Sequence, residues 1–151
     1  MTLYLWTPGE LWVTMLDYLK GVMDYFPEVI KGISTIPVAN HLFQVRPEDK
    51  CMLLYEERVT ASNHTVSQLL FVTPRASKDI KTSIDLILTR VRIPDEDDWG
   101  KLVRVLRYIR VTLHLPLILR ADSLNVIKWW VDASFATQPD CKGHTGTKIS
   151  I

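Results

Sequence analysis

The carboxylate of Asp132 is the first of two candidate sites in this sequence, because its type and position suggest catalytic chemistry. It follows the apolar run 129–131, where a buried strand would meet the opening of a site. Carboxylates placed in this way commonly bind Mg²⁺, which prefers hard oxygen ligands. A hydrolytic site with two metal ions needs several carboxylates, and the nearest others in the sequence, Asp122 and Asp140, lie in predicted turns. From the residues alone, the favoured interpretation of Asp132 is an ordinary acid at a strand end.

Cys141 and His144 have a spacing that is found in metal sites, but they supply only half of a structural zinc set. No second pair lies within reach in the sequence, which disfavours zinc. The sequence also lacks a nucleophile-elbow pattern, and its six glycines form no phosphate-binding loop. The adjacent Trp129 and Trp130 are interpreted as packing on the two faces of a strand rather than as a platform for stacking bases.

A row of basic residues is the second candidate site. Between Trp99 and Arg120 the sequence has five positive charges and no acid, and four of the five recur every third residue on one side of a predicted helix: Lys101, Arg104, Arg107 and Arg110. Such a row could follow a phosphate backbone, with salt-dependent affinity at each contact. The alternative is a solvated helix face, which the pattern alone favours.

The composition gives no global sign of a partner. Eighteen Lys and Arg against seventeen Asp and Glu give a net charge of +1, and 47% of the residues are hydrophobic, enough for a real core. No stretch approaches the roughly 18 apolar residues of a membrane helix. The two cysteines, Cys51 and Cys141, occur without a signal-peptide pattern. We therefore expect an intracellular protein, cytoplasmic or nuclear and not secreted, with reduced thiols and no membrane partner.

The first part of the chain reads as a hairpin followed by helices. The stretch "MTLYLWTPGELWVTM" predicts two short strands around Pro8-Gly9, a pair that suits a type II turn. Thr14 is a candidate N-cap for a helix that ends at Pro27. Residues 32–49 are interpreted as an ordered loop. Further helices are predicted from residue 56 to near 73, and from an N-cap at Ser77 to the residue before Pro94.

The clearest helix comes next and is followed by a change of period. Residues 95–110 open with four acids and close with arginines, as the helix dipole favours, and Trp99, Leu102, Leu106 and Ile109 form the buried stripe. After Pro116, "LILR", "LNVIKWWVDASFA" and "HTGTKISI" predict three strands of one sheet. The predicted fold class is α+β: an N-terminal β-hairpin, three to four helices, then a two- to three-stranded antiparallel fragment. The predicted domains are residues 1–114 and 115–151.

Three stretches resemble the Pol polyprotein of copia-type LTR retrotransposons. "TVSQLLFVTPRASKDIKTSIDLILTRV" is similar to the segment beyond the polymerase palm, although one more residue separates Arg75 from Asp79 than in that family. "DDWGKLVRVLRYIRVT" is similar to a helix of the family with Trp and then Arg-Val-Leu-Arg-Tyr; the usual Gly-Thr after it is Val-Thr here, at 111–112. "VDASFATQPDCKGHTG" resembles the opening of the ribonuclease H domain.

The resemblance implies a role for each candidate site. Residues 1–114 would be the C-terminal part of a reverse transcriptase, with a primer-grip-like hairpin and helices of a thumb or connection region. Residues 115–151 would be the truncated start of a ribonuclease H-like domain, with Asp132 as a catalytic ligand of Mg²⁺ and Cys141 and His144 as loop residues. The implied partners are the backbone of an RNA–DNA hybrid or DNA duplex, which the basic helix would hold, and the remaining segments of Pol.

The same resemblance also implies that both active sites are incomplete. The polymerase motif Tyr-x-Asp-Asp does not occur in the sequence, and the other carboxylates of the ribonuclease H family would follow Ile151. We therefore expect no polymerase or ribonuclease H turnover and no tightly bound Mg²⁺, which leaves the enzyme class of the chain itself open. Two alternatives remain: a nucleic-acid-binding module without catalysis, and a translated transposon remnant without a function.

Overall fold

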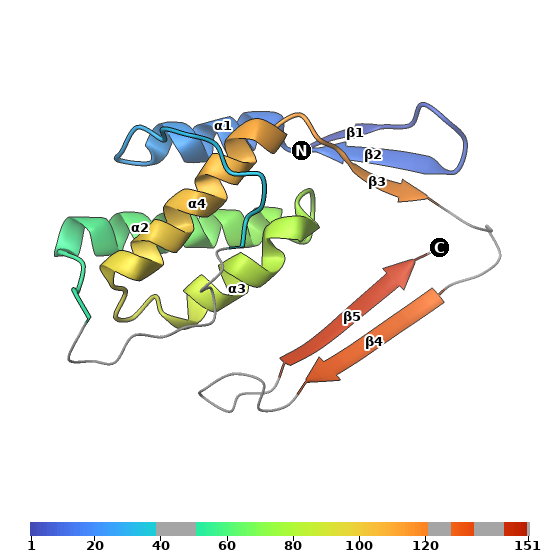
Figure 1. The fold of residues 1–151 in the computed structure, drawn as a ribbon. Coiled ribbons are helices and arrows are strands. Elements are labelled where there is room, and N and C mark those ends of the chain that lie inside the picture. Colours follow the sequence, from blue (N-terminus) through green and yellow to red (C-terminus); the bar gives the residue numbers. More distant parts are fainter. Residues whose placement is uncertain (39–50, 121–127, 135–143, 151) are drawn as a thin grey trace. The chain divides into compact units, whose positions relative to one another are not determined.

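The structure, a computed structural model, describes residues 1–38, 51–120, 128–134 and 144–150 (Figure 1). It confirms the predicted α+β class, with N-terminal strands, then helices, then further strands. The chain divides into two compact units. One consists of Met1–Thr2 and Val13–Leu117 and contains every helix of the described residues; the other consists of Leu3–Trp12 and Ile118–Ile151. None of the described helices is long and apolar enough to cross a membrane.

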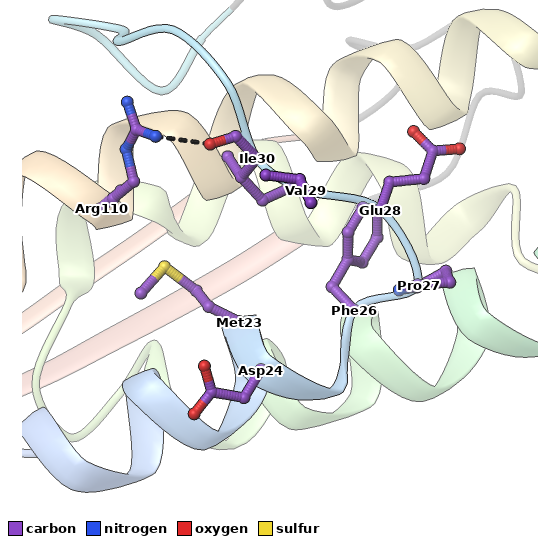
Figure 2. A pocket seen from close by; sticks show the side chains of 8 residues that line it. All are labelled: Met23, Asp24, Phe26, Pro27, Glu28, Val29, Ile30 and Arg110. Carbon is purple, nitrogen blue, oxygen red and sulfur yellow. Dashed lines mark hydrogen bonds between the residues drawn. The ribbon is translucent and has the colours of Figure 1, made fainter.

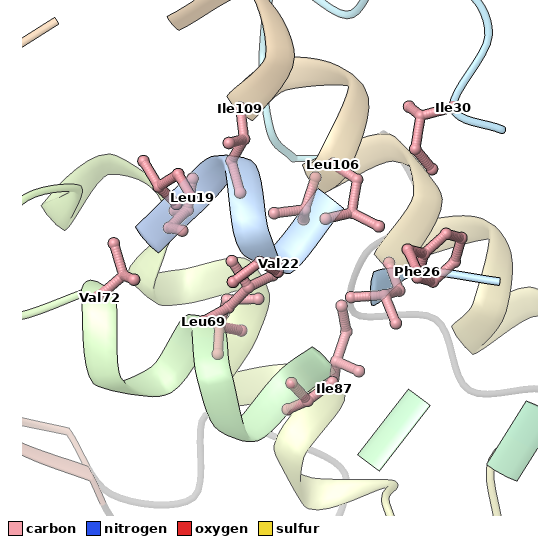
Figure 3. Close-up of a cluster of buried hydrophobic side chains, with 14 of the residues drawn as sticks. Leu19, Val22, Phe26, Ile30, Leu69, Val72, Ile87, Leu106 and Ile109 are labelled. Atoms are coloured by element: carbon pink, nitrogen blue, oxygen red, sulfur yellow. The ribbon is translucent and has the colours of Figure 1, made fainter. Parts of the chain in front are cut away.

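In its described residues the helical unit contains four α-helices and one 3₁₀ turn. These are α1 (Leu16–Tyr25), α2 (Glu56–Val72), η2 (Lys78–Ile80), α3 (Lys81–Thr89) and α4 (Glu96–Thr112). Their apolar faces meet in one core, to which each helix contributes side chains (Figure 3). The predicted stripe of α4 is buried in this core, with Leu102, Leu106 and Ile109 at most 2% exposed. Burial of each such side chain stabilises the fold by about 1.5–3 kcal/mol.

The first turn of α4 is fixed by a reciprocal capping box. The carboxylate of Asp95 accepts hydrogen bonds from the backbone N–H groups of Asp97 and Asp98, both at 2.9 Å. The carboxylate of Asp98 in turn accepts from the backbone N–H of Asp95 at 3.2 Å. This pattern satisfies amide groups that have no partner within the helix. The predicted acidic start of the helix therefore stabilises it through specific hydrogen bonds as well as through the helix dipole.

Two predicted caps are corrected by the structure. Thr14 does not cap α1, because the N-cap residue is Met15 and no side chain bonds the first turn. Ser77 precedes η2 and makes no capping hydrogen bond, and α3 ends at Thr89, not at the residue before Pro94. Residues 90–93 instead form tight turns, in which Ile93 N–H donates to the carbonyl of Arg90 at 3.1 Å. Proline disfavours the helical conformation in the residue before it, which helps to explain the early end.

The strands that the structure describes form two sheets. β1 (Thr2–Tyr4), β2 (Glu10–Thr14) and β3 (Leu117–Arg120) make an antiparallel sheet in the order β1-β2-β3. Gly9 between β1 and β2 has φ +83°, and Glu10 N–H donates to the Thr7 carbonyl at 3.0 Å, as the predicted type II turn requires. β4 (Lys128–Ser134) and β5 (His144–Ser150) pair with each other, antiparallel.

The partner of β3 corrects the sequence analysis. "LILR" was predicted to share a sheet with the two later strands, but β3 lies beside β2 (Figure 1). An alternation of apolar and polar residues predicts that β3 is a strand, but it does not say which other strand β3 pairs with. The strand that follows β3 in the sequence is therefore not necessarily its partner. The hairpin residues Leu3–Trp12 form one compact unit with Ile118–Ile151, and the predicted domain division at residues 114 and 115 stays a prediction.

Candidate nucleic-acid interface

The four basic residues predicted to form a binding row do not lie in equivalent surroundings. Lys101 is only 4% exposed, and its ammonium group pairs with the carboxylate of Asp97 one turn earlier, at 2.9 Å. A buried ammonium group with a carboxylate partner is not available to a phosphate backbone. The row that faces outward therefore comprises Arg104, Arg107 and Arg110, which are half-buried. We call these three residues the arginine row.

Two guanidinium groups of the arginine row donate to backbone carbonyls of a segment far away in sequence. Arg104 Nε donates to the carbonyl of Val38 at 3.1 Å. Arg110 donates to the carbonyls of Ile30 and Gly32, and the first of these bonds is drawn in Figure 2. Residues 27–38, which we call the strap, thus run along α4 and supply neutral acceptors to two of its three arginines.

Arg107 differs from its two neighbours. Its Nε atom is buried and has no hydrogen-bond partner among the described residues. A methyl group at Gly32 would lie 3.9 Å from this atom, so the strap also passes close to Arg107. A buried N–H group of a guanidinium without an acceptor is costly. Arg107 is therefore the member of the row whose donor capacity is least used.

The charge of the arginine row is not neutralised within the described part of the chain. None of its members lies within ion-pair distance of a carboxylate there. Three other arginines do have acidic partners: Arg58 pairs with Glu28 and Glu96, Arg90 with Asp95 and Asp98, and Arg120 with Glu10. Three unit charges on about two turns of helix create a local positive field although the whole chain is nearly neutral.

The strap is anchored at both ends. At its start, the carboxylate of Glu28 pairs with Arg58 at 2.5 Å, and Arg58 also bonds Glu96 at the start of α4. The side chain of Ile30 enters the helical core. At its end is the bond from Arg104 to Val38. Strap residues 32–38 are the beginning of the loop predicted over residues 32–49, and residues 39–49 of that loop lie outside the described ranges.

A cavity of about 350 Å³ lies between the strap and the last turn of α1 (Figure 2). Its apolar lining comes from Met23, Phe26 and Ile30, and Arg110 lies on its α4 side. Asp24 and Glu28 place two carboxylates on the same lining, so the cavity does not favour an anionic ligand. A second cavity, of about 310 Å³, lies near η2 and the end of α4; Asp79, which helps to line it, accepts a hydrogen bond from the hydroxyl of Tyr108 on α4.

Asp132 lies in β4, where it is paired with Gly146 of β5, and its side chain is not among those described. His144, the first residue of β5, is paired with Ser134; Asp122, Asp140 and Cys141 lie outside the described ranges. Within those ranges, no three His, Cys, Asp or Glu side chains gather as a metal site would require. One carboxylate is one ligand of an ion that takes about six, so these residues do not fit a complete Mg²⁺ site and no catalytic step follows from them.

The sequence analysis missed the network around Arg58. Besides pairing with Glu28 and Glu96, its guanidinium stacks on the ring of Trp99, 4.9 Å from the centroid, and on Tyr55 at 5.4 Å. These contacts join α2, α4 and the strap. The only signal in the sequence was an arginine in the first turn of a predicted helix, which is a poor place for a cation unless it has acidic partners.

The thiol of Cys51 shows no sign of activation. Loss of contact with water raises its pKa, and a hydrogen bond with Asp95 raises it further. Because the thiolate is the reactive form, these contacts oppose a nucleophilic role.

Comparison with known proteins found no match: no family model, no curated protein and no solved structure matches this chain.

Proposed function

We propose that this chain is a segment of a copia-type retrotransposon Pol polyprotein, covering the end of the reverse transcriptase and the opening of the ribonuclease H domain. The motifs around Trp99 and Asp132 support this assignment. The order of elements is compatible with it: a hairpin, a helical unit with an arginine-bearing α4, and a β4–β5 pair with Asp132 in its first strand.

In this proposal the helical unit binds the backbone of an RNA–DNA hybrid or a DNA duplex. The observation that carries the proposal is that no carboxylate of the described residues pairs with the arginine row. Arginine bonds phosphate oxygens in a fixed fork and releases counterions when it does so, which supplies affinity without reading sequence. Lys101 is omitted from this interface, because its charge is used within α4.

Arg107 offers the cleanest test of the interface. Its buried Nε has no partner and its guanidinium makes no hydrogen bond within the described residues, so Arg107→Ala removes a charge without removing a described hydrogen bond. Arg92→Ala is the matched control, because Arg92 is exposed, lies outside the row and has no ion pair in the described ranges. A fluorescent RNA–DNA hybrid is titrated with each variant at several salt concentrations.

We expect the wild-type chain to bind the hybrid with an affinity that falls steeply with salt. Arg107→Ala is expected to weaken binding and to lower the slope of log affinity against log salt by about one. Arg92→Ala should leave the slope nearly unchanged. Failure of the wild-type chain to bind at low salt, or equal losses in both variants, would overturn the assignment of the interface to α4.

Catalysis is not part of the proposal for the chain alone, because two-metal hydrolysis needs carboxylates in addition to Asp132. The proposed contribution of Asp132 is one oxygen ligand in the parent enzyme. Incubation of the purified chain with a hybrid and Mg²⁺ is expected to leave the RNA intact. Cleavage that disappears in Asp132→Asn would show that this expectation is wrong.

A transposon remnant without a retained function is the second candidate, and the departures from the family pattern at Arg75–Asp79 and at 111–112 favour it. The genomic sequence on both sides of the reading frame separates the two. An open frame with Tyr-x-Asp-Asp upstream and further carboxylates downstream supports a segment of a working polyprotein. Frames interrupted by stop codons on both sides support a remnant.

A further inference from the structure

The strap and a bound nucleic acid would compete for the same donors. The guanidinium groups of Arg104 and Arg110 are already engaged by the carbonyls of Val38, Ile30 and Gly32, while they would also be the phosphate ligands of the proposed interface. A duplex backbone can bond them fully only where these carbonyls withdraw. The inference that follows rests on the proposed function and concerns its regulation.

The exchange is chemically favourable for the arginines. A backbone carbonyl is a neutral acceptor, whereas a phosphate group carries charge and can accept two parallel hydrogen bonds from one guanidinium, so the phosphate is the stronger partner. The phosphate would also neutralise charge that the strap leaves uncompensated. The strap holds the row in the absence of a polyanion, but a polyanion is the better partner.

The strap has the features of a segment that can leave locally. Ile33 is 69% exposed and Ile36 is 49% exposed, so the strap beyond Ile30 buries little apolar surface. Its only internal side-chain bond among the described contacts runs from Ser34 Oγ to the carbonyl of Ile36, at 2.7 Å. Segments with few buried apolar contacts open at a small fraction of the global unfolding free energy.

We propose that the strap is a built-in competitor of nucleic acid: it covers the arginine row at rest and is displaced when a duplex backbone binds. The Glu28–Arg58 ion pair and the bonds from Arg104 and Arg110 hold the strap in place at rest. The apparent affinity for duplex then equals the intrinsic affinity multiplied by the fraction of molecules with an open strap. Changes that loosen the strap tighten binding.

Gly32 allows a test that leaves charge unchanged. Its φ of +80° suits glycine, so Gly32→Ala strains the strap at the carbonyl that Arg110 bonds, although the added methyl group has room. Gly21→Ala in α1 is the control for the same substitution without strain, because a methyl group there meets nothing within 4 Å and φ is not positive. Gly9→Ala introduces comparable strain in the β1–β2 turn, away from the strap.

The measurements are hybrid affinity, and amide hydrogen exchange of the strap with and without saturating hybrid. We expect Gly32→Ala to bind about fivefold more tightly than wild type, or better, while Gly21→Ala and Gly9→Ala bind as wild type does. Bound hybrid should speed exchange at Lys31, Ile33 and Val38 in the wild-type chain.

Glu28→Gln provides a second variant in case Gly32→Ala does not fold. Glu28→Gln weakens the ion pair with Arg58. Asp24→Asn is its control, because it removes an equal charge from the same cavity lining, and Asp24 makes no anchoring contact among the described residues. The proposal requires tighter hybrid binding by Glu28→Gln than by Asp24→Asn.

The outcomes separate the two proposals. Hybrid binding by the wild-type chain with no gain in Gly32→Ala or Glu28→Gln over their controls, and with unchanged exchange of the strap, overturns competition and leaves the interface standing. Absence of hybrid binding in every variant overturns both. A gain in affinity confined to the strap variants, together with faster strap exchange on binding, supports both.

Discussion

The two halves of α4 use their charges in opposite ways. In the first half every charged group has a charged or capping partner: Asp95 and Asp98 with each other's amides and with Arg90, Glu96 with Arg58, and Asp97 with Lys101. In the second half Arg104 and Arg110 donate to backbone carbonyls of the strap, and within the described residues no member of the arginine row pairs with an acid. The first half is thus fixed by its charges, and the second half retains charge that another molecule can neutralise.

The difference also appears in the acids near each half. Burial raises the pKa of Asp98, and the hydrogen bonds from the Asp95 amide and from Arg90 offset only part of this cost of burying the carboxylate. Near the second half, Asp79 accepts a hydrogen bond from Tyr108 and does not pair with an arginine. The carboxylate of Asp79 is thus bonded to a hydroxyl group of α4, and it does not neutralise the charge of the arginine row.

The largest effect is expected from removing the cap in the first half. Asp95→Ala deletes the acceptor of two backbone N–H groups in a residue that is 2% exposed. We expect a loss of about 2–4 kcal/mol in the free energy of unfolding, from the lost cap and from the weakened partner of Arg90. Urea denaturation followed by circular dichroism measures it. Asp85→Ala, which removes a solvent-facing ion pair with Lys81, is the control and should cost less than about 1 kcal/mol.

If Asp95→Ala were no more destabilising than Asp85→Ala, the first half of α4 would not be fixed by its charges, and the contrast with the second half would fail.

A smaller effect is expected in the second half, and it should differ between two arginines of one row. Arg110→Gln removes two bonds to the strap and should lower the free energy of unfolding by about 1–3 kcal/mol. Arg107→Gln removes a guanidinium without a hydrogen bond in the described residues and should change it by less than about 0.5 kcal/mol. The same denaturation experiment compares them. Equal losses would mean that the carbonyl bonds of Arg110 do not hold the strap.

The sequence predicted those features that local signals determine. Pro8-Gly9 specifies the turn between β1 and β2. Pro74 prevents α2 from continuing beyond Thr73, and the acids before Trp99 mark the start of α4. Such signals act within a few residues, where backbone preferences and capping decide the structure. The extent of α2 and α4 was therefore predicted to within a few residues.

Features that depend on distant contacts could not be predicted in this way. The partner of β3 is β2, a strand more than a hundred residues earlier in the chain. The alternation of apolar and polar residues in β3 carries no information about this pairing. Regular spacing placed Lys101 with the three arginines, but the packing of α4 buries it. The acceptors of Arg104 and Arg110 are backbone carbonyls, which every residue possesses and which therefore leave no mark in the sequence.

The smallest effect concerns Tyr108, whose hydroxyl donates a hydrogen bond to Asp79. The hydrogen bond to Asp79, together with burial, raises the pKa of Tyr108 from 10.0 to about 12. A raised pKa means that the folded state holds the proton more tightly, so this contribution to stability is complete below pH 10 and is lost as the pH rises through about 12. We expect Tyr108→Phe to be less stable than wild type by about 0.5–1 kcal/mol near neutral pH, and the difference to vanish as the phenol ionises.

Denaturation of both proteins at neutral and at alkaline pH measures this difference, and the ultraviolet absorbance of phenolate follows the titration. Tyr55→Phe is the control, because Tyr55 lies outside the contact with Asp79. A Tyr108 that ionises together with the other tyrosines would show that Asp79 is not held by its hydroxyl. The second half of α4 would then lack its described bond to an acid, and the contrast between the two halves would rest on the arginine row alone.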